Sequence, residues 1–489
     1  MSVEVRSRYS IGALSALFVV GVAALRLHEA EPGLLYPDGY QYLMMAKGIA
    51  EHGRPLLTLG PHGDTLLPNG DAAAKPLYPA IVALFHGFGL TWLGAARTVT
   101  ALAATCVALL AGMLARRLSG SWLAALVAAT ACIASRELSF WSGFAGPDAL
   151  GEALALAAAL AFLCRRARAG GVLAALAIIA RPELALVALA AAGVGLSRSD
   201  LRRPAGDASL AAVLTLAVLL AALRPPLEPP STAAVLLGAL LASLAAAAFV
   251  ALTHEGPRIV RLLLGGVVAA IVLVAPLHDG AGGLLLWAHH DWPLLLAGTV
   301  GAVVAARSVR LRPTLAAILL AGALLLLVYS VKNPGSDRYL ALLTPLVAVL
   351  ASFAASSSAR LNDRAVALGV VGLVALTLAL PRLPARSTDQ FPTVAAQLEA
   401  LHLPRLPFVT AAPDAYGVLV PDRSFVAARA GARGLIIADG AQRTYASSLR
   451  PEGRTLATLD PGAGFVQPDG ALDQRPVRII LGTVMRRSP

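Results

Sequence analysis

Residues 9–27 read YSIGALSALFVVGVAALRL and contain a single charged side chain, Arg26. An α-helix of about 20 apolar residues is long enough to cross the roughly 30 Å hydrocarbon core of a bilayer. The apolar run is long for the core of a cleaved signal peptide, and further apolar blocks of similar length follow it. The stretch therefore predicts the first of many membrane-spanning helices.

The composition of the whole chain agrees with this interpretation. Of its 489 residues, 57% are hydrophobic and 14% are charged, against about 25% charged residues in soluble domains. The mean hydropathy is +0.72. A soluble globular enzyme and a disordered chain are both excluded, because the first needs a more charged surface and the second has few apolar residues.

The net charge of +12 is explained by topology rather than by nucleic-acid binding. The basic residues stand in short loops between apolar blocks, as the positive-inside rule requires. Only three of the 40 basic residues are lysines, which is typical of a bacterial genome rich in G and C. The cysteines, Cys106, Cys132 and Cys164, lie in apolar blocks and lack the spacing of metal ligands.

About 13 membrane spans are predicted. A further apolar segment, 76–90, is short and amphipathic, and we expect it to lie along the membrane interface. The predicted spans are 9–27, 93–115, 121–135, 147–164, 171–180, 183–196, 207–223, 232–252, 259–277, 284–306, 312–331, 338–357 and 363–381.

The charge pattern orients these spans. With the N-terminus in the cytoplasm, the inner segments carry 17 arginines and the short outer loops after the first carry five basic residues. We therefore expect a multi-pass protein of the bacterial plasma (inner) membrane. Residues 1–381 form the helical membrane domain, whose first outer loop is 29–92. Residues 382–489 are rich in Pro, Gly, Asp and Arg with short Val/Ile runs, which predicts a small extracytoplasmic α/β domain.

The first outer loop contains the most informative motif, YPDGYQYLMMAKGIAEHG at 36–53. Tyr42, Met45, Ala46 and Ile49 recur with helical spacing, so we expect a helix along the outer membrane surface. Asp38 begins that helix. It is predicted to cap the helix N-terminus, to act as a general base at the membrane boundary, or to do both.

The three lysines of the chain, Lys47, Lys75 and Lys332, all fall on the predicted outer face. Arginine satisfies the positive-inside rule elsewhere in this chain, so the lysines indicate a need for a compact ammonium group, for example against a phosphate. Contact with lipid headgroups and ordinary loop ion pairs are the alternatives.

Four motifs, in this order, resemble those of the GT-C class of integral-membrane glycosyltransferases, in particular bacterial members related to protein O-mannosyltransferases and aminoarabinose transferases. Lys75 stands where those relatives usually have His, and Asp38 lacks a second acid two residues away. The motifs are Asp38-Gly39-Tyr40-Gln41-Tyr42-Leu43, Lys75-Pro76-Leu77-Tyr78-Pro79, Ala180-Arg181-Pro182-Glu183 and Ser336-Asp337-Arg338-Tyr339-Leu340 with Pro345 after it.

The resemblance implies a polyprenyl-phosphate sugar donor and transfer, with inversion, to an acceptor hydroxyl of a glycan, lipid or protein. It implies that Asp38 is the general base and that Lys75, Arg338 and Lys332 hold the donor phosphate. A divalent cation is left open. The residues expected to line the cavity or contact the acceptor are Tyr40, Tyr42, Tyr78, Arg136, Glu137, Asp148, Arg181 and Asp337.

Two other classes of function are compatible with the sequence. One is a transporter or flippase of a lipid-linked or polar substrate, although the two related halves common in transporters are not visible here. The other is a non-catalytic assembly protein that keeps the GT-C fold.

For the adjacent His289 and His290, packing is favoured over metal binding, because neighbouring residues on a helix point about 100° apart.

Overall fold

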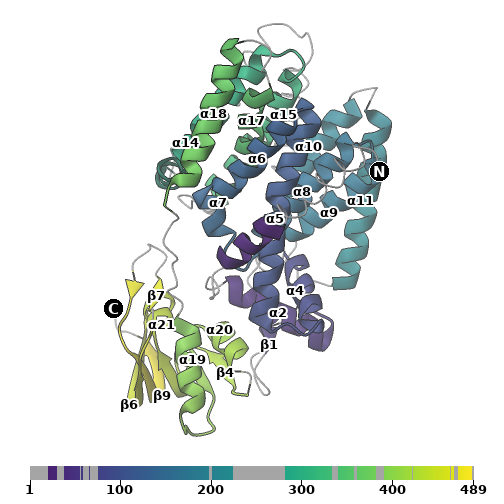
Figure 1. The fold of residues 1–489 in the computed structure, drawn as a ribbon. Helices are drawn as coiled ribbons and strands as arrows, with labels where there is room; N and C mark the ends of the chain where they lie inside the picture. The colour runs from purple at the N-terminus through teal and green to yellow at the C-terminus, as the bar shows by residue number, and fades with distance from the viewer. Residues whose placement is uncertain are drawn as a thin grey trace, which may run out of the picture.

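A computed structural model gives the fold of the chain (Figure 1). It describes residues 20–29, 38–55, 57–58, 65–66, 75–197, 201–223, 281–332, 340–356, 361–381, 390–420, 422–462, 464–466 and 472–486. The described part is mostly helical, with a small sheet near the C-terminus, as the sequence predicted.

The helical body begins with a helical segment at 20–29. It continues with α2 (Asp38–His52), a two-stranded hairpin of β1 (Leu57–Thr58) and β2 (Thr65–Leu66), α4 (Leu77–Gly87), α5 (Trp92–Ser119), α6 (Trp122–Ala134), α7 (Arg136–Trp141), α8 (Asp148–Leu163), α9 (Ala167–Ala180), α10 (Leu184–Ser197), α11 (Arg202–Leu223), α14 (Ala281–Arg307), α15 (Arg312–Lys332), α17 (Thr344–Ser356) and α18 (Leu361–Ala379).

Local sequence explains where the central helices begin and end. Thr91 caps α5, since its hydroxyl accepts a hydrogen bond from the amide of Gly94 at 3.1 Å. Gly120 ends α5 in the left-handed conformation, with φ 78°. Ser121 then caps α6 and Ser135 caps α7 in the same way as Thr91. In space α5 packs against α6 and α8, α9 packs between α8 and α11, and α17 joins α14 to α6.

The number of membrane spans is the part of the fold prediction that is not confirmed. Over the described ranges, α5 and α11 are the two helices long and apolar enough to cross a membrane. The other predicted spans that are described form helices as well, several of them shorter apolar ones, such as α6 and α17. The predicted spans 232–252 and 259–277 lie outside the described residues.

One long helix is interrupted where the sequence contains a proline. In α14 the backbone leaves helical geometry at Asp291 (φ −117°, ψ 25°), two residues before Pro293. Proline has no N–H to complete the helical ladder and its ring crowds the preceding turn, which accounts for the break. The break also turns the Asp291 carboxylate toward α7, whose residues bind it.

The C-terminal part folds as a sheet with helices. Its five-stranded sheet has the order β4 (Phe425–Ala427), β3 (Phe408–Thr410), β5 (Arg433–Ala438), β9 (Val477–Arg486) and β6 (Leu449–Leu459). The pairs of β3 with β4 and with β5 are parallel, whereas β9 runs antiparallel to both of its neighbours. The remaining elements are α19 (Gln390–Ala400), α20 (Pro413–Leu419), α21 (Gly440–Tyr445) and the hairpin of β7 (Phe465–Val466) with β8 (Leu472–Asp473).

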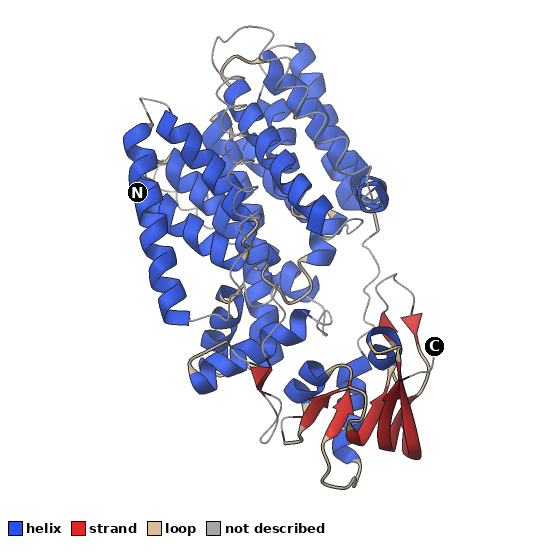
Figure 2. Cartoon of the chain, turned by 180° about the vertical axis from the view of Figure 1, so that it is seen from behind, coloured by secondary structure: helices blue, strands red, loops and turns tan. Residues whose placement is uncertain are grey.

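Strand alternation gives this sheet two buried faces. Ile437 and its partner Ile479 belong to a core that includes Phe391 of α19 and Tyr416 of α20. Ile436 and its partner point the other way, into a smaller cluster. The helix-covered face is continuous with the core around α2, and α2 contacts α20 directly. Figures 1 and 2 show the sheet beyond the α2 end of the helical body.

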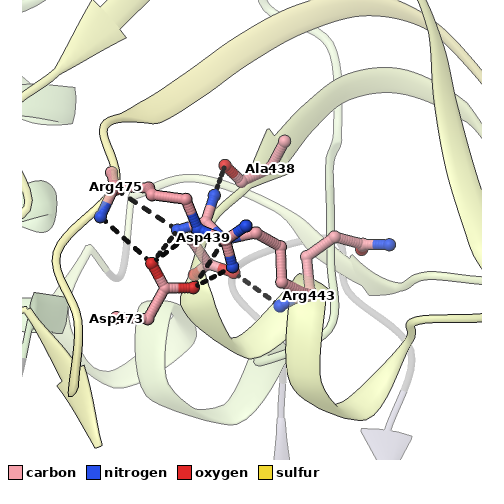
Figure 3. A network of polar contacts seen from close by, with 6 residues as sticks. Ala438, Asp439, Arg443, Asp473 and Arg475 are labelled. Carbon is pink, nitrogen blue, oxygen red and sulfur yellow. Dashed lines mark hydrogen bonds and ion pairs between the residues drawn. The ribbon is translucent and has the colours of Figure 1, made fainter. Parts of the chain in front are cut away.

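A polar network holds the edge of this domain together (Figure 3). The Asp473 carboxylate accepts hydrogen bonds from Arg443 (Nε to Oδ2, 2.7 Å) and from Arg475 (terminal nitrogen to Oδ2, 2.8 Å). These arginines hold the pKa of Asp473 well below its usual range, with Arg475 the main cause. Asp439 caps α21 and also accepts a hydrogen bond from the Tyr416 hydroxyl at 2.8 Å.

We expect Asp473→Asn to lower the free energy of unfolding of the protein by roughly 2 kcal/mol, because it removes charge-assisted hydrogen bonds. The pKa is lower in the folded than in the unfolded state, so this stabilisation is present above about pH 4 and is lost as the pH falls below it. Thermal unfolding of purified wild type and variant between pH 3 and pH 7 tests the prediction. Equal stability at neutral pH would contradict it.

Candidate active site

The proposed site begins at the N-terminus of α2, where Asp38 is half-buried in the first turn. A carboxylate there is stabilised by the positive end of the helix dipole. The structure differs from the expected surface helix with one apolar face. Tyr40 and Met44 are buried together with Tyr42 and Met45, so α2 is enclosed on opposite sides.

One side of α2 rests on α4. The ring of Tyr42 meets that of Tyr78 edge to face, with centroids 5.8 Å apart. The Tyr78 hydroxyl donates to the carbonyl of Ala96 at 3.1 Å and lies 3.0 Å from Thr100 Oγ1, which anchors α4 to α5. Lys75, two residues before α4 begins, is 3% exposed. A buried ammonium group requires polar or anionic neighbours, because leaving it unpaired costs several kcal/mol.

The other side of α2 is covered by the C-terminal domain. Phe391 lies edge-on between Tyr40 (5.3 Å) and Tyr416 (5.2 Å), which continues the aromatic packing from the helical body into the sheet. Asp414, in the first turn of α20, is 5% exposed and accepts hydrogen bonds from its neighbour's amide and from the side chain of Gln41. Burial, and to a smaller extent the charge of Asp38, raise the pKa of Asp414 to about 6.

Arg136 and Glu137 belong to a second polar group, between α7 and α14. The Asp291 carboxylate accepts hydrogen bonds from the hydroxyl of Ser135 (2.5 Å) and the amide of Arg136 (2.9 Å) at the N-terminus of α7. Glu137 is fully buried, contacts His290 and accepts a hydrogen bond from the Trp141 ring at 3.0 Å. The polar packing predicted for the His289-His290 pair therefore applies to His290, which binds α7.

Asp148 and Arg181 belong to a third group. Arg181 is 1% exposed, forms an ion pair with Asp148 at the start of α8, and places its Nε 3.3 Å from a Glu183 carboxylate oxygen. The short segment between α9 and α10 thereby closes onto α8. Gly151 makes room for this, since a methyl group at that position would collide with the Arg181 side chain.

The remaining predicted site residues are not placed. Lys332 is the last residue of α15, and its side chain is not among those that the structure describes. Asp337 and Arg338 lie outside the described residues. Over the described ranges, no group of three or more His, Cys, Asp or Glu side chains is arranged to hold a metal ion. The predicted residues thus separate into the α2–α4 group, the α7–α14 group and the α8–α9 group.

Sequence reasoning missed Asp414 and Gln41 at this site. Gln41 lay inside the quoted motif, but nothing in the motif distinguished it from a solvated residue. Asp414 lies in the first turn of a short helix that follows a strand, where an aspartate is common because the helix dipole favours negative charge. Another missed residue is Glu152 of α8, whose carboxylate oxygens are both buried and have no hydrogen-bond partner among the residues described.

The fold is similar to those of solved structures of ArnT and of an archaeal oligosaccharyltransferase, which agrees with the resemblance to GT-C enzymes expected from the sequence. No protein-family model matches the sequence, and neither does any curated protein.

Three solved structures show the resemblance. ArnT from Cupriavidus metallidurans in the apo state is 14% identical, with a TM-score of 0.51 over 96% of this chain and 98% of that one. The archaeal oligosaccharyltransferase AglB from Archaeoglobus fulgidus, in complex with an inhibitory peptide and a dolichol-phosphate, is 13% identical, with a TM-score of 0.50 over 88% of this chain and 70% of that one. The apo form of the Archaeoglobus fulgidus oligosaccharyltransferase is 12% identical, with a TM-score of 0.51 over 88% of this chain and 70% of that one.

We expect Arg181→Met to destabilise the protein by about 3–5 kcal/mol, because it leaves two buried carboxylates without their cation. The triple variant with Asp148→Asn and Glu183→Gln as well removes the uncompensated charges and should regain part of that loss. Thermal unfolding in detergent compares the variants with wild type. A single variant as stable as wild type would show that the ion pairs contribute nothing.

The raised pKa of Asp414 makes a distinct prediction about pH. The folded state holds this proton up to about pH 6, whereas the unfolded chain loses it near 3.8, so stability is highest below 3.8 and falls as the pH rises to 6. The loss is at most about 3 kcal/mol, from about 1.4 kcal/mol per pH unit. Unfolding of wild type and Asp414→Asn from pH 3.5 to 7 checks this. Identical pH dependence in both would refute it.

Proposed function

We propose that the protein is a membrane glycosyltransferase that moves a sugar from a polyprenyl-phosphate donor to an acceptor hydroxyl on the outer face of the bacterial plasma membrane. The observation that carries the proposal is the position of Asp38 on a GT-C fold. It stands at the N-terminus of α2, where the helical body meets the C-terminal domain. The similar AglB structure contains a dolichol-phosphate, which supports a lipid-phosphate donor as the substrate class.

The chemistry requires a base and a cation at one place. The acceptor oxygen forms a bond to C1 of the sugar while the bond from C1 to the phosphate oxygen breaks, which inverts the configuration. Asp38 takes the proton of the acceptor hydroxyl, and a carboxylate does this efficiently when it lies within hydrogen-bond reach. Lys75 stabilises the negative charge that develops on the leaving phosphate.

The two groups lie at the N-terminal ends of adjacent helices. Lys75 precedes α4, which packs along α2, and the Tyr42–Tyr78 contact fixes one helix against the other. Electrostatic catalysis depends on charges that are already in position before the reaction, so a rigid pair of helices suits this task. Arg338 and Lys332 are proposed as further phosphate-binding residues. The acceptor is a glycan, lipid or protein hydroxyl, and Tyr40, Tyr42 and Tyr78 are proposed to shape its cavity.

Removing the base should abolish transfer. In liposomes supplied with a panel of polyprenyl-phosphate sugars, Asp38→Asn should release lipid phosphate at least about 100-fold more slowly than wild type, because the neutral amide takes no proton. Asp207→Asn, which changes a partly exposed carboxylate on α11 that lies 3.9 Å from Arg168, is the matched control and should keep the wild-type rate. Full activity of Asp38→Asn would rule out the assignment of the base.

Removing the cation should weaken binding of the donor and slow the loss of its phosphate. Lys75→Gln is expected to raise KM for the donor and to lower kcat, with kcat/KM falling roughly 10- to 100-fold. Lys47→Gln is the control, since Lys47 is more exposed and lies 3.9 Å from Glu51 on the same helix. Equal effects of the two substitutions would argue against a specific phosphate contact at Lys75.

A further inference from the structure

Two turns of the helical body bring exposed arginines together. Arg116 and Arg117 stand in the last turn of α5, and Arg165 and Arg166 stand between α8 and α9. All four residues are exposed. A terminal nitrogen of Arg117 donates to the carbonyl of Leu163 at 3.1 Å, which ties the end of α5 to the end of α8. These arginines therefore surround one junction of helices, called the arginine junction below.

The arginine junction contains little negative charge. Among residues 114–124, 160–171 and 201–208, all of which the structure describes, Asp207 is the one carboxylate, and it lies 3.9 Å from Arg168. Arg202 and Arg203 add exposed cations at the start of α11, which packs on α9 beside α8 (Figure 1). The ends of α5 and α8 carry partial negative charge, which favours arginine there without cancelling the full charges.

The length of α5 sets the depth of the arginine junction in a membrane. This helix is long and apolar enough to cross a bilayer, and it begins at Trp92, where α4 packs on it. With a rise of about 1.5 Å per residue, Arg116 lies roughly 36 Å along α5 from Trp92. The hydrocarbon core is about 30 Å thick. The arginine junction and the α2–α4 group therefore lie at opposite surfaces of the membrane, and the arginines are at the level of lipid phosphates.

Trp122 marks the same level. It is the first residue of α6, it is 64% exposed, and the guanidinium carbon of Arg116 lies 3.2 Å from its ring centre. Tryptophan is enriched at membrane–water interfaces, and its ring attracts a cation placed over its face. Leu123 and Leu126 of the same helix are exposed as well. Apolar surface for acyl chains therefore adjoins the arginines.

The backbone of the turn between α8 and α9 does not call for an arginine. Arg165 has φ 61°, in the left-handed region that glycine occupies with least strain. An exposed arginine at this position makes no packing contribution that a smaller residue would lack. Its charge is therefore the property that distinguishes it at this position.

We propose that the arginine junction binds the headgroup of an anionic phospholipid. Basic pockets between transmembrane helices hold such headgroups through their phosphates. The guanidinium group suits this ligand, because its planar set of donors matches the oxygens of a phosphate. The arginines of the two turns contact the phosphate from two sides, and the acyl chains lie along the exposed face of α6. This site is separate from the candidate active site and does not depend on the proposed function.

Native mass spectrometry of the full chain in detergent tests the ligand class. Cardiolipin, phosphatidylglycerol and phosphatidylcholine are added in equal amounts, and both anionic lipids should bind at least about tenfold more tightly than phosphatidylcholine. Inorganic phosphate separates a lipid site from a site for free phosphate. At millimolar concentration it should leave the bound lipid in place, since it has no acyl chains. Displacement by inorganic phosphate, or equal binding of phosphatidylcholine, would overturn the proposal.

A double variant tests the residues. Arg165→Asn with Arg166→Gln removes two charges, and asparagine tolerates the left-handed conformation. Its affinity for cardiolipin should fall about tenfold or more. The matched control, Arg307→Gln with Arg310→Gln, changes two exposed arginines at the end of α14 and in the turn after it, and it should keep the wild-type affinity. Unchanged affinity in the first variant, or equal losses in both, would contradict the site.

Thermal unfolding guards against a misfolded variant. Without added lipid, the Arg165→Asn, Arg166→Gln variant should unfold at the wild-type temperature. Cardiolipin should raise Tm of wild type and of the control, because a ligand that binds the folded state stabilises it, and should raise Tm of the variant less. Arg116→Gln, which leaves the α8–α9 turn intact, provides a second variant and should lower the affinity about fivefold. The same rise in Tm for all variants would also overturn the proposal.

Discussion

The burial of α2 on two sides is the constraint on which the proposed site depends. One side rests on α4 through the Tyr42–Tyr78 contact, and the other is closed by Phe391 from the C-terminal domain. Aromatic pairs of this geometry contribute about 0.5–1.5 kcal/mol each beyond their buried area. A helix held in this way presents the residue at its N-terminus, Asp38, in one orientation, which a helix lying free on a membrane surface would not do.

Buried charges reinforce the helical body at the points where its helices end. Arg181 pairs with Asp148 and Glu183 between α9 and α10, and Asp291 binds the N-terminus of α7 where α14 is broken. Such groups are costly to desolvate and add little net stability. Their effect is to specify geometry, because a helix end displaced from its partner would leave a charge unpaired. The predicted cavity residues Arg136, Glu137, Asp148 and Arg181 all take part in these contacts.

Much of the fold follows from patterns within the sequence, and the site follows only in part. The apolar blocks predicted most helices of the helical body, although not α2 or α7, and the resemblance carried by the four motifs agrees with the fold of the similar structures. The helical spacing of Tyr42 and Met45 identified one buried face of α2. It did not reveal that Tyr40 and Met44 are buried as well, because the groups covering them come from residues about 350 positions away. For the same reason Asp414 resembled an ordinary helix cap. Local periodicity carries no information on which distant element docks on a helix.

Phe391, which covers the second side of α2, lies far from that helix in the sequence, and this distance has a consequence for biosynthesis. Ribosomes make the chain from its N-terminus, so Asp38 leaves the ribosome hundreds of residues before Phe391 and Asp414 do. Until that late segment has been synthesised and folded, one flank of α2 stays uncovered. A nascent or truncated chain that lacks residues 382–489 would thus lack Phe391, the aromatic partner that packs on Tyr40 of α2.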